Sequence, residues 1–176
     1  DVRVLKNAAQ IVGRSSIRIN GIENPSEGEY RPGCIDVIDM KNVDPETLAV
    51  GKVSAVAGEA AFQYVKKAIG LAMAGEVDAT VTNALNKEAL NLAGPHYSGH
   101  TEIYAEFTGT EKYTMMLAHK NLRVVHVSTH VALREACDRV KKDRIIEVIR
   151  IAEQACKDMG IGNPRIGVAG LNPHCG

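Results

Sequence analysis

Short apolar runs alternate with longer amphipathic segments along this chain, and this alternation limits the folds open to it. Strand-like runs are expected at residues 17–20, 34–40, 77–82, 113–118, 122–128 and 165–169. The spacing of apolar residues predicts helices at residues 2–12, 58–74, 87–92, 101–107, 133–140 and 143–159. Such alternation is typical of an α/β fold with a largely parallel sheet. We find no internal repeat and no linker that would mark a domain boundary.

The composition excludes several classes of protein. Lys plus Arg and Asp plus Glu both number 21, so no excess positive charge favours binding to nucleic acid or to an anionic membrane. No apolar run approaches the roughly 20 residues that a membrane helix needs, and neither end resembles a signal peptide. The four cysteines are too scattered for a zinc ribbon or a thioredoxin motif. We therefore expect reduced thiols and a cytoplasmic location.

Two histidines follow apolar runs that we expect to be strands. His130 follows residues 122–129, and His174 follows residues 166–171. Ligands of parallel α/β sheets bind beyond the carboxyl ends of the strands, where Thr82 is also expected. Neutral imidazole is the commonest protein metal ligand, and two imidazoles with a third group can form an open metal site. The alternative is that each is an ordinary hydrogen-bonded histidine at a strand end.

A third histidine stands at the expected start of a helix. His100 and Thr101 follow Ser98 and Gly99, and the free backbone N–H groups of a first helical turn favour an anion. The imidazole and the hydroxyl could add hydrogen bonds to a carboxylate or a phosphate. Plain capping of the helix by Ser98 or Thr101 explains the same residues equally well.

The segment Thr82-Asn83-Ala84-Leu85-Asn86-Lys87 connects an expected strand to an expected helix. Its polar side chains could hold substrate oxygens. Equally, Asn86 could be a helix cap and Lys87 a solvated charge. The glycines of a P-loop are absent, and no G-x-G-x-x-G motif supports a Rossmann nucleotide site.

In chain order, several motifs together resemble the PdxA family, the 4-hydroxythreonine-4-phosphate dehydrogenases. They are Thr82-x-x-Leu85-Asn86-Lys87-Glu88-Ala89-Leu90, Ser98-Gly99-His100-Thr101-Glu102, Met115-Met116-Leu117-Ala118, Leu122-Arg123-Val124-Val125, Thr129-His130-x-x-Leu133-Arg134 and Gly170-Leu171-Asn172-Pro173-His174. The resemblance covers about residues 53–176 well and the first fifty residues loosely. Because the motifs are unrelated to one another and stand in the right order, the resemblance is specific.

The resemblance implies an α/β/α sandwich like that of isocitrate and isopropylmalate dehydrogenases, and a homodimer with its active site at the subunit interface. It also implies NAD- or NADP-dependent oxidation of a 4-phosphorylated hydroxy acid, followed by decarboxylation. A divalent metal (Zn, Mg, Mn or Co) is held in the family by three histidines, two of which match His130 and His174. His100 and Thr101 match substrate-binding positions. No catalytic residue is assigned.

The chain departs from the family pattern in three places. The amino-terminal Gly/Pro-rich motif is absent, as is the carboxy-terminal part that carries the third histidine, so we expect residues 1–176 to be an internal portion of a longer protein. Asn83-Ala84 stands where the family usually has Gly/Ala-Pro, which resembles the sister group acting on D-threonate or D-erythronate 4-phosphate. Two competing hypotheses are a metal-dependent hydrolase that uses the same histidines and a non-catalytic phosphometabolite-binding module.

Overall fold

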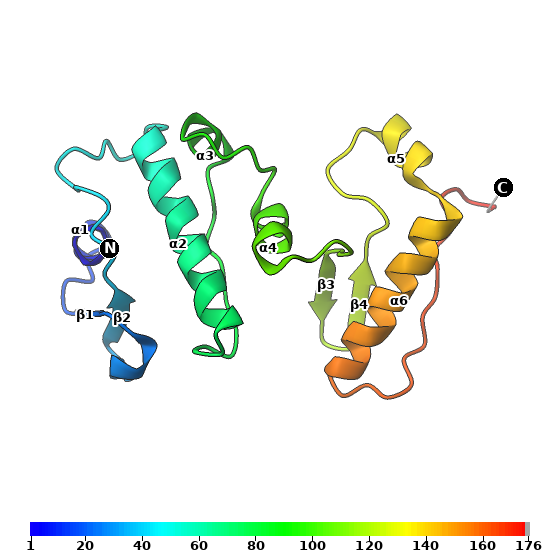
Figure 1. The fold of residues 1–176 in the computed structure, drawn as a ribbon, viewed down its shortest axis with the longest axis horizontal. Helices are drawn as coiled ribbons and strands as arrows, with labels where there is room; N and C mark the ends of the chain where they lie inside the picture. Colours follow the sequence, from blue (N-terminus) through cyan, green and yellow to red (C-terminus); the bar gives the residue numbers. More distant parts are fainter. Residues whose placement is uncertain (175–176) are drawn as a thin grey trace. The chain divides into compact units, whose positions relative to one another are not determined.

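The computed structural model describes residues 1–174 and divides the chain into two compact units, Asp1–Gly109 and Thr110–Gly176 (Figure 1). The first unit contains α1 (Val2–Ile11), β1 (Arg18–Ile22), a short 3₁₀ helix (Pro25–Glu27), β2 (Cys34–Ile38), α2 (Ala55–Met73), α3 (Lys87–Leu92) and α4 (His100–Thr108). The second contains β3 (Met116–His119), β4 (Leu122–Val125), α5 (Leu133–Arg139) and α6 (Lys142–Asp158). All six predicted helices are confirmed. No described helix is long and apolar enough to cross a membrane.

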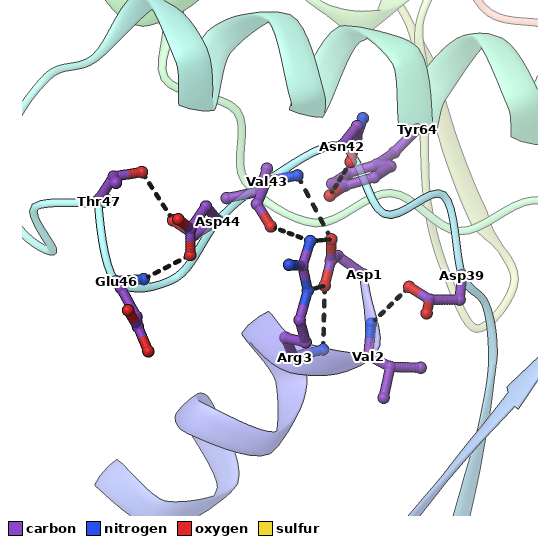
Figure 2. Close-up of polar contacts among 10 residues, drawn as sticks. All are labelled: Asp1, Val2, Arg3, Asp39, Asn42, Val43, Asp44, Glu46, Thr47 and Tyr64. Carbon is purple, nitrogen blue, oxygen red and sulfur yellow. Dashed lines mark hydrogen bonds and ion pairs between the residues drawn. The ribbon is translucent and has the colours of Figure 1, made fainter.

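A buried carboxylate fixes the start of α1. The side chain of Asp1 accepts a hydrogen bond from the backbone N–H of Arg3 at 3.0 Å and caps the helix. Figure 2 shows this carboxylate between the Arg3 guanidinium, with which it forms an ion pair at 3.2 Å, and the backbone of Val43. Asp39 accepts a further bond from the N–H of Val2 at 3.0 Å. These contacts attach α1 to the chain that follows β2.

The two strands of the first unit form a parallel pair. Arg18 stands opposite Cys34 at one end of the pair, and Ile22 stands opposite Ile38 at the other. Parallel strands require a long connection, which the 3₁₀ helix and its flanking loops provide here.

The main core of the first unit lies where α2 packs on α3 and α4 (Figure 1). It consists of buried apolar side chains from the three helices, namely Phe62, Val65, Ile69, Leu90 and Ile103. Ser54 caps α2 by accepting a bond from the N–H of Ala57 at 3.4 Å. The close approach of α2 to α3 depends on Gly58, because a Cβ built there would lie 1.9 Å from the carbonyl oxygen of Ala89.

Two of the predicted strands are wrong. Residues 77–82 and 165–169 form no strand among the described residues, and Val81 is 98% exposed. Both segments carry apolar runs, but a strand exists only where a neighbouring backbone completes its hydrogen-bond ladder. No described strand pairs with either segment.

In the second unit, β3 and β4 form an antiparallel hairpin in which Met116 faces Val125 and His119 faces Leu122. Lys120 in the two-residue turn has a φ of 51°, the left-handed conformation that tight hairpin turns need. The guanidinium of Arg144 on α6 donates to the carbonyl of Tyr113 at 2.9 Å and to that of Val127 at 3.2 Å. One side chain thus attaches α6 to the chain on both sides of the hairpin.

Candidate functional site

A hollow of about 240 Å³ in the first unit contains the strongest candidate site. Its lining comes from three parts of the unit: Ala61, Tyr64, Val65 and Ala68 on α2, residues 81–85, and His100 on α4. The structure therefore brings His100 together with residues 81–85, which lie 15 to 19 positions earlier in the chain. Most of the wall is aliphatic, and the polar groups come from Tyr64, Thr82, Asn83 and His100.

The segment that forms one wall is held at both of its ends. At the first end, the hydroxyl of Tyr104 on α4 donates to the hydroxyl of Thr80 at 2.8 Å. At the other end, Leu85 packs against the core, and the side chain of Asn86 accepts from the N–H of Ala89 at 2.8 Å. Asn86 is therefore the N-cap of α3, which is the alternative to a substrate-binding role that the sequence left open. The residues between these anchors remain exposed.

His100 and Thr101 are the first two residues of α4, and both are half-buried. The N-cap of this helix is Gly99, and no side chain caps it, so the expected capping by Ser98 or Thr101 is wrong. A Cβ built at Gly99 would lie 3.9 Å from the Cε of Lys87, which shows that the Lys87 side chain runs beside the start of α4. Only His100 of the two predicted substrate-binding residues is part of the hollow lining.

Tyr64 is a lining residue that the sequence reasoning did not single out. Its hydroxyl donates to Asn42 at 2.8 Å (Figure 2), and burial raises the pKa of the phenol. The side chain is therefore neutral at physiological pH. The signal was present in the sequence, because positions 61, 64, 65 and 68 follow helical spacing on one face of α2.

The predicted metal ligands, His130 and His174, both belong to the second unit and are both exposed. His130 has a φ of 54°, a left-handed backbone conformation that few non-glycine residues adopt. His126 directly follows the end of β4 and is half-buried, with its Nδ1 3.5 Å from the carbonyl oxygen of Met115. Across residues 1–174, no group of three or more His, Cys, Asp or Glu side chains is gathered closely enough to hold a metal ion. Cys175 lies outside the described residues.

Comparison with known proteins gives a consistent result over the whole chain. The sequence model of the family described as "Pyridoxal phosphate biosynthetic protein PdxA" matches residues 1–176. A protein of Pectobacterium atrosepticum named D-threonate 4-phosphate dehydrogenase is 46% identical over 161 residues, which are 92% of this chain and 49% of that protein. The chain spans about half the length of the curated relatives it matches.

Solved structures of proteins with PdxA-family names also resemble this chain. The crystal structure of 4-hydroxythreonine-4-phosphate dehydrogenase from Klebsiella pneumoniae has a TM-score of 0.92 at 40% identity and covers 98% of this chain and 53% of its own. The corresponding enzyme from Burkholderia phymatum has a TM-score of 0.86 at 43% identity, with 99% and 52% covered. This likeness confirms the predicted α/β fold class. The chain corresponds to about half of each of these solved structures. Because the family model matches every residue, the chain belongs to the PdxA family.

Proposed function

We propose that this chain is part of an NAD- or NADP-dependent, divalent-metal-dependent dehydrogenase that oxidises and decarboxylates a 4-phosphorylated hydroxy acid. The substrate would be 4-hydroxythreonine 4-phosphate or D-threonate or D-erythronate 4-phosphate. The observation that carries the proposal is the 46% identity to a protein named D-threonate 4-phosphate dehydrogenase. The hollow beside His100 supports it, because this histidine, the first residue of a helix that no side chain caps, lines the hollow together with the polar residues Tyr64, Thr82 and Asn83.

The proposed roles follow from the chemistry of each side chain. His100 and Thr101 would bind substrate oxygens through the imidazole, the hydroxyl and the free N–H groups of the first turn of α4. Lys87 beside that turn would add positive charge for an anionic group. These contacts would fix the position of the reacting carbon relative to the nicotinamide, which lowers the entropic part of the barrier.

For the metal, the proposed ligands within this chain are His130 and His174. Exposed imidazoles are suitable donors for the divalent ions in question, although among residues 1–174 neither histidine belongs to a group of three or more possible ligands. Such an ion, when bound, would act as a Lewis acid on the substrate hydroxyl and on the oxygen that becomes negative when CO2 leaves. We also propose a cytoplasmic homodimer with the site at the subunit interface, which analytical ultracentrifugation and site-directed variants can examine.

The test uses the intact protein, dialysed against chelator and then reloaded with Zn, Mg, Mn or Co. NADH or NADPH formation is followed by absorbance, with 4-hydroxythreonine 4-phosphate and D-threonate 4-phosphate measured side by side. Chelator-sensitive formation of reduced nicotinamide with either substrate supports the proposal. Turnover without nicotinamide would indicate the hydrolase instead, and binding without turnover would indicate a phosphometabolite-binding module.

A further inference from the structure

The guanidinium of Arg144 on α6 makes three hydrogen bonds, each from a different nitrogen. Its Nε donates to the carbonyl of Val127 at 3.2 Å, and its Nη2 donates to the carbonyl of Tyr113 at 2.9 Å. Its Nη1 donates to the carboxylate of Glu147 at 2.6 Å, one turn further along α6. Because the guanidinium is a rigid planar fork, these bonds fix the two carbonyls relative to α6.

Glu147 holds the guanidinium in this orientation. Its carboxylate pairs with Arg144 and, at 3.7 Å, with the Nζ of Lys112. The hydrogen bond from Arg144 lowers the pKa of Glu147, so the carboxylate is ionised at neutral pH. The Arg144 side chain is 31% exposed, whereas the other ion-paired arginines among residues 1–174 are at least 49% exposed. Water therefore competes less for the bonds of Arg144 than for theirs.

The segment that follows Val127 contains His130 and has no polar anchor of its own. Within the described part of the chain, residues 128–131 form no hydrogen bond or ion pair. The next bonded group is the carbonyl of Ala132, which accepts from the N–H of Ala136 at 2.9 Å where α5 begins. His130 nevertheless has a φ of 54°, which a non-glycine residue keeps only where the surrounding chain imposes it. Arg144 supplies the last bond before this residue.

We infer that Arg144 is a positioning residue for His130, because it holds the carbonyl of Val127 three residues earlier and so fixes where the imidazole is presented. The inference rests on the proposed function, in which His130 binds a divalent metal. An imidazole that is already held loses less conformational entropy when it binds. Arg144 belongs to none of the motifs that resemble the family.

The experiment uses four variants of the intact protein. Arg144→Met keeps an unbranched apolar stem and removes every donor, and Arg144→Lys keeps the charge but cannot bond both carbonyls through a rigid fork. Arg150→Met is the matched control, since Arg150 is an exposed arginine on α6 without a hydrogen bond or ion pair among the described residues. Val148→Ala controls for stability, because Val148 is 3% exposed on the same helix and its loss leaves the bonds of Arg144 in place.

The first measurement needs no metal. Histidine is labelled with 15N in chelator-treated protein, His130→Ala identifies the signal of the His130 backbone amide, and its heteronuclear NOE reports motion on the ps–ns timescale. We expect this NOE to fall in Arg144→Met, to fall less in Arg144→Lys and to stay at the wild-type value in both controls. Arg144→Lys carries the test if Arg144→Met does not fold. An unchanged NOE in the Arg144 variants, or an equal fall in Val148→Ala, overturns the inference.

The second measurement is the dissociation constant for zinc, obtained by competition with a chelator at a temperature where every variant is folded. Arg144→Met should weaken zinc binding about tenfold, as the loss of outer support for a metal ligand does, and the two controls should not weaken it. Equal zinc affinity in Arg144→Met and the wild type overturns the inference. Failure of the proposed function has a different signature, namely a wild type that binds no divalent metal. In that event the NOE decides whether Arg144 positions His130.

Discussion

The hydroxyl of Tyr104 donates to the hydroxyl of Thr80 at 2.8 Å, and this bond joins residues 24 positions apart. Tyr104 lies one turn after His100 on α4, and Thr80 immediately precedes the segment that forms a wall of the hollow. The two sides of the candidate site are thus connected by one polar contact. Both residues are partly buried. If one hydroxyl is removed, the other loses its hydrogen bond, and water replaces that bond only incompletely.

Tyr104→Phe removes only the donor and keeps the ring that packs against the core. We expect it to lower the free energy of unfolding by about 1 kcal/mol, measured by urea denaturation, and to raise KM for the substrate because one anchor of the wall is lost. Tyr113→Phe is the control, since the Tyr113 hydroxyl has no hydrogen bond among the described residues. Equal stability of the two variants would contradict the role of the Tyr104 contact.

Gly58 and Gly70 lie in the same helix but in opposite environments. A Cβ at Gly58 would stand 1.9 Å from the Ala89 carbonyl oxygen and 2.7 Å from the Leu90 nitrogen, whereas nothing lies within 4 Å of a Cβ at Gly70. We expect Gly58→Ala to destabilise the protein by about 2 to 3 kcal/mol by forcing α2 away from α3. Gly70→Ala should stabilise it by about 0.5 to 1 kcal/mol through helix propensity. Denaturant unfolding of the two variants measures both effects, and the same sign in both would refute the close helix contact.

Asp39 makes the stability of the first unit depend on pH. Its carboxylate accepts from the N–H of Val2 at 3.0 Å, and this bond, with a second from the N–H of Lys41, holds the pKa of Asp39 below its usual value. The ionised form is therefore favoured in the folded state. Its contribution is complete above the unfolded pKa of about 4 and is lost as pH falls through the lower folded pKa.

Asp39→Asn removes this titration while its amide oxygen can still accept from Val2. We expect the variant to lose less stability than the wild type between about pH 5 and about pH 2, measured by urea unfolding at a series of pH values. Parallel curves for the two proteins across that range would show that Asp39 does not contribute to the acid sensitivity.

His130→Ala and His174→Ala test the proposed metal ligands. Each change removes an imidazole, so the metal content of the intact, reloaded protein should fall sharply. His96→Ala and His119→Ala provide controls, because both of these histidines are also exposed and neither belongs to the predicted ligand set. The ligand assignment fails if metal stoichiometry, measured by atomic emission, is the same in all four variants and in the wild type.

The sequence predicted the helices well because their determinants are local. The stripe that includes Val65 and Ile69 places α2 to within a few residues, and Asn86 caps α3 through a bond within its own first turn. His100 could likewise be placed at a helix start from its neighbours alone. Apolar runs such as residues 77–82 predicted strands less well, because a strand forms only beside a neighbouring strand, and the run itself does not specify that neighbour.

The hollow could not be derived from spacing. Its lining joins α2, residues 81–85 and the start of α4, which are separated along the chain and meet only when the core around Phe62 and Leu90 forms. Periodicity indicates which face of a helix is apolar, but not which distant segment will cover it. The sequence by itself determined the helices and the order of the family motifs, because these depend on neighbouring residues. Only the tertiary structure decided which polar groups share the hollow with His100, because long-range packing brings those groups together.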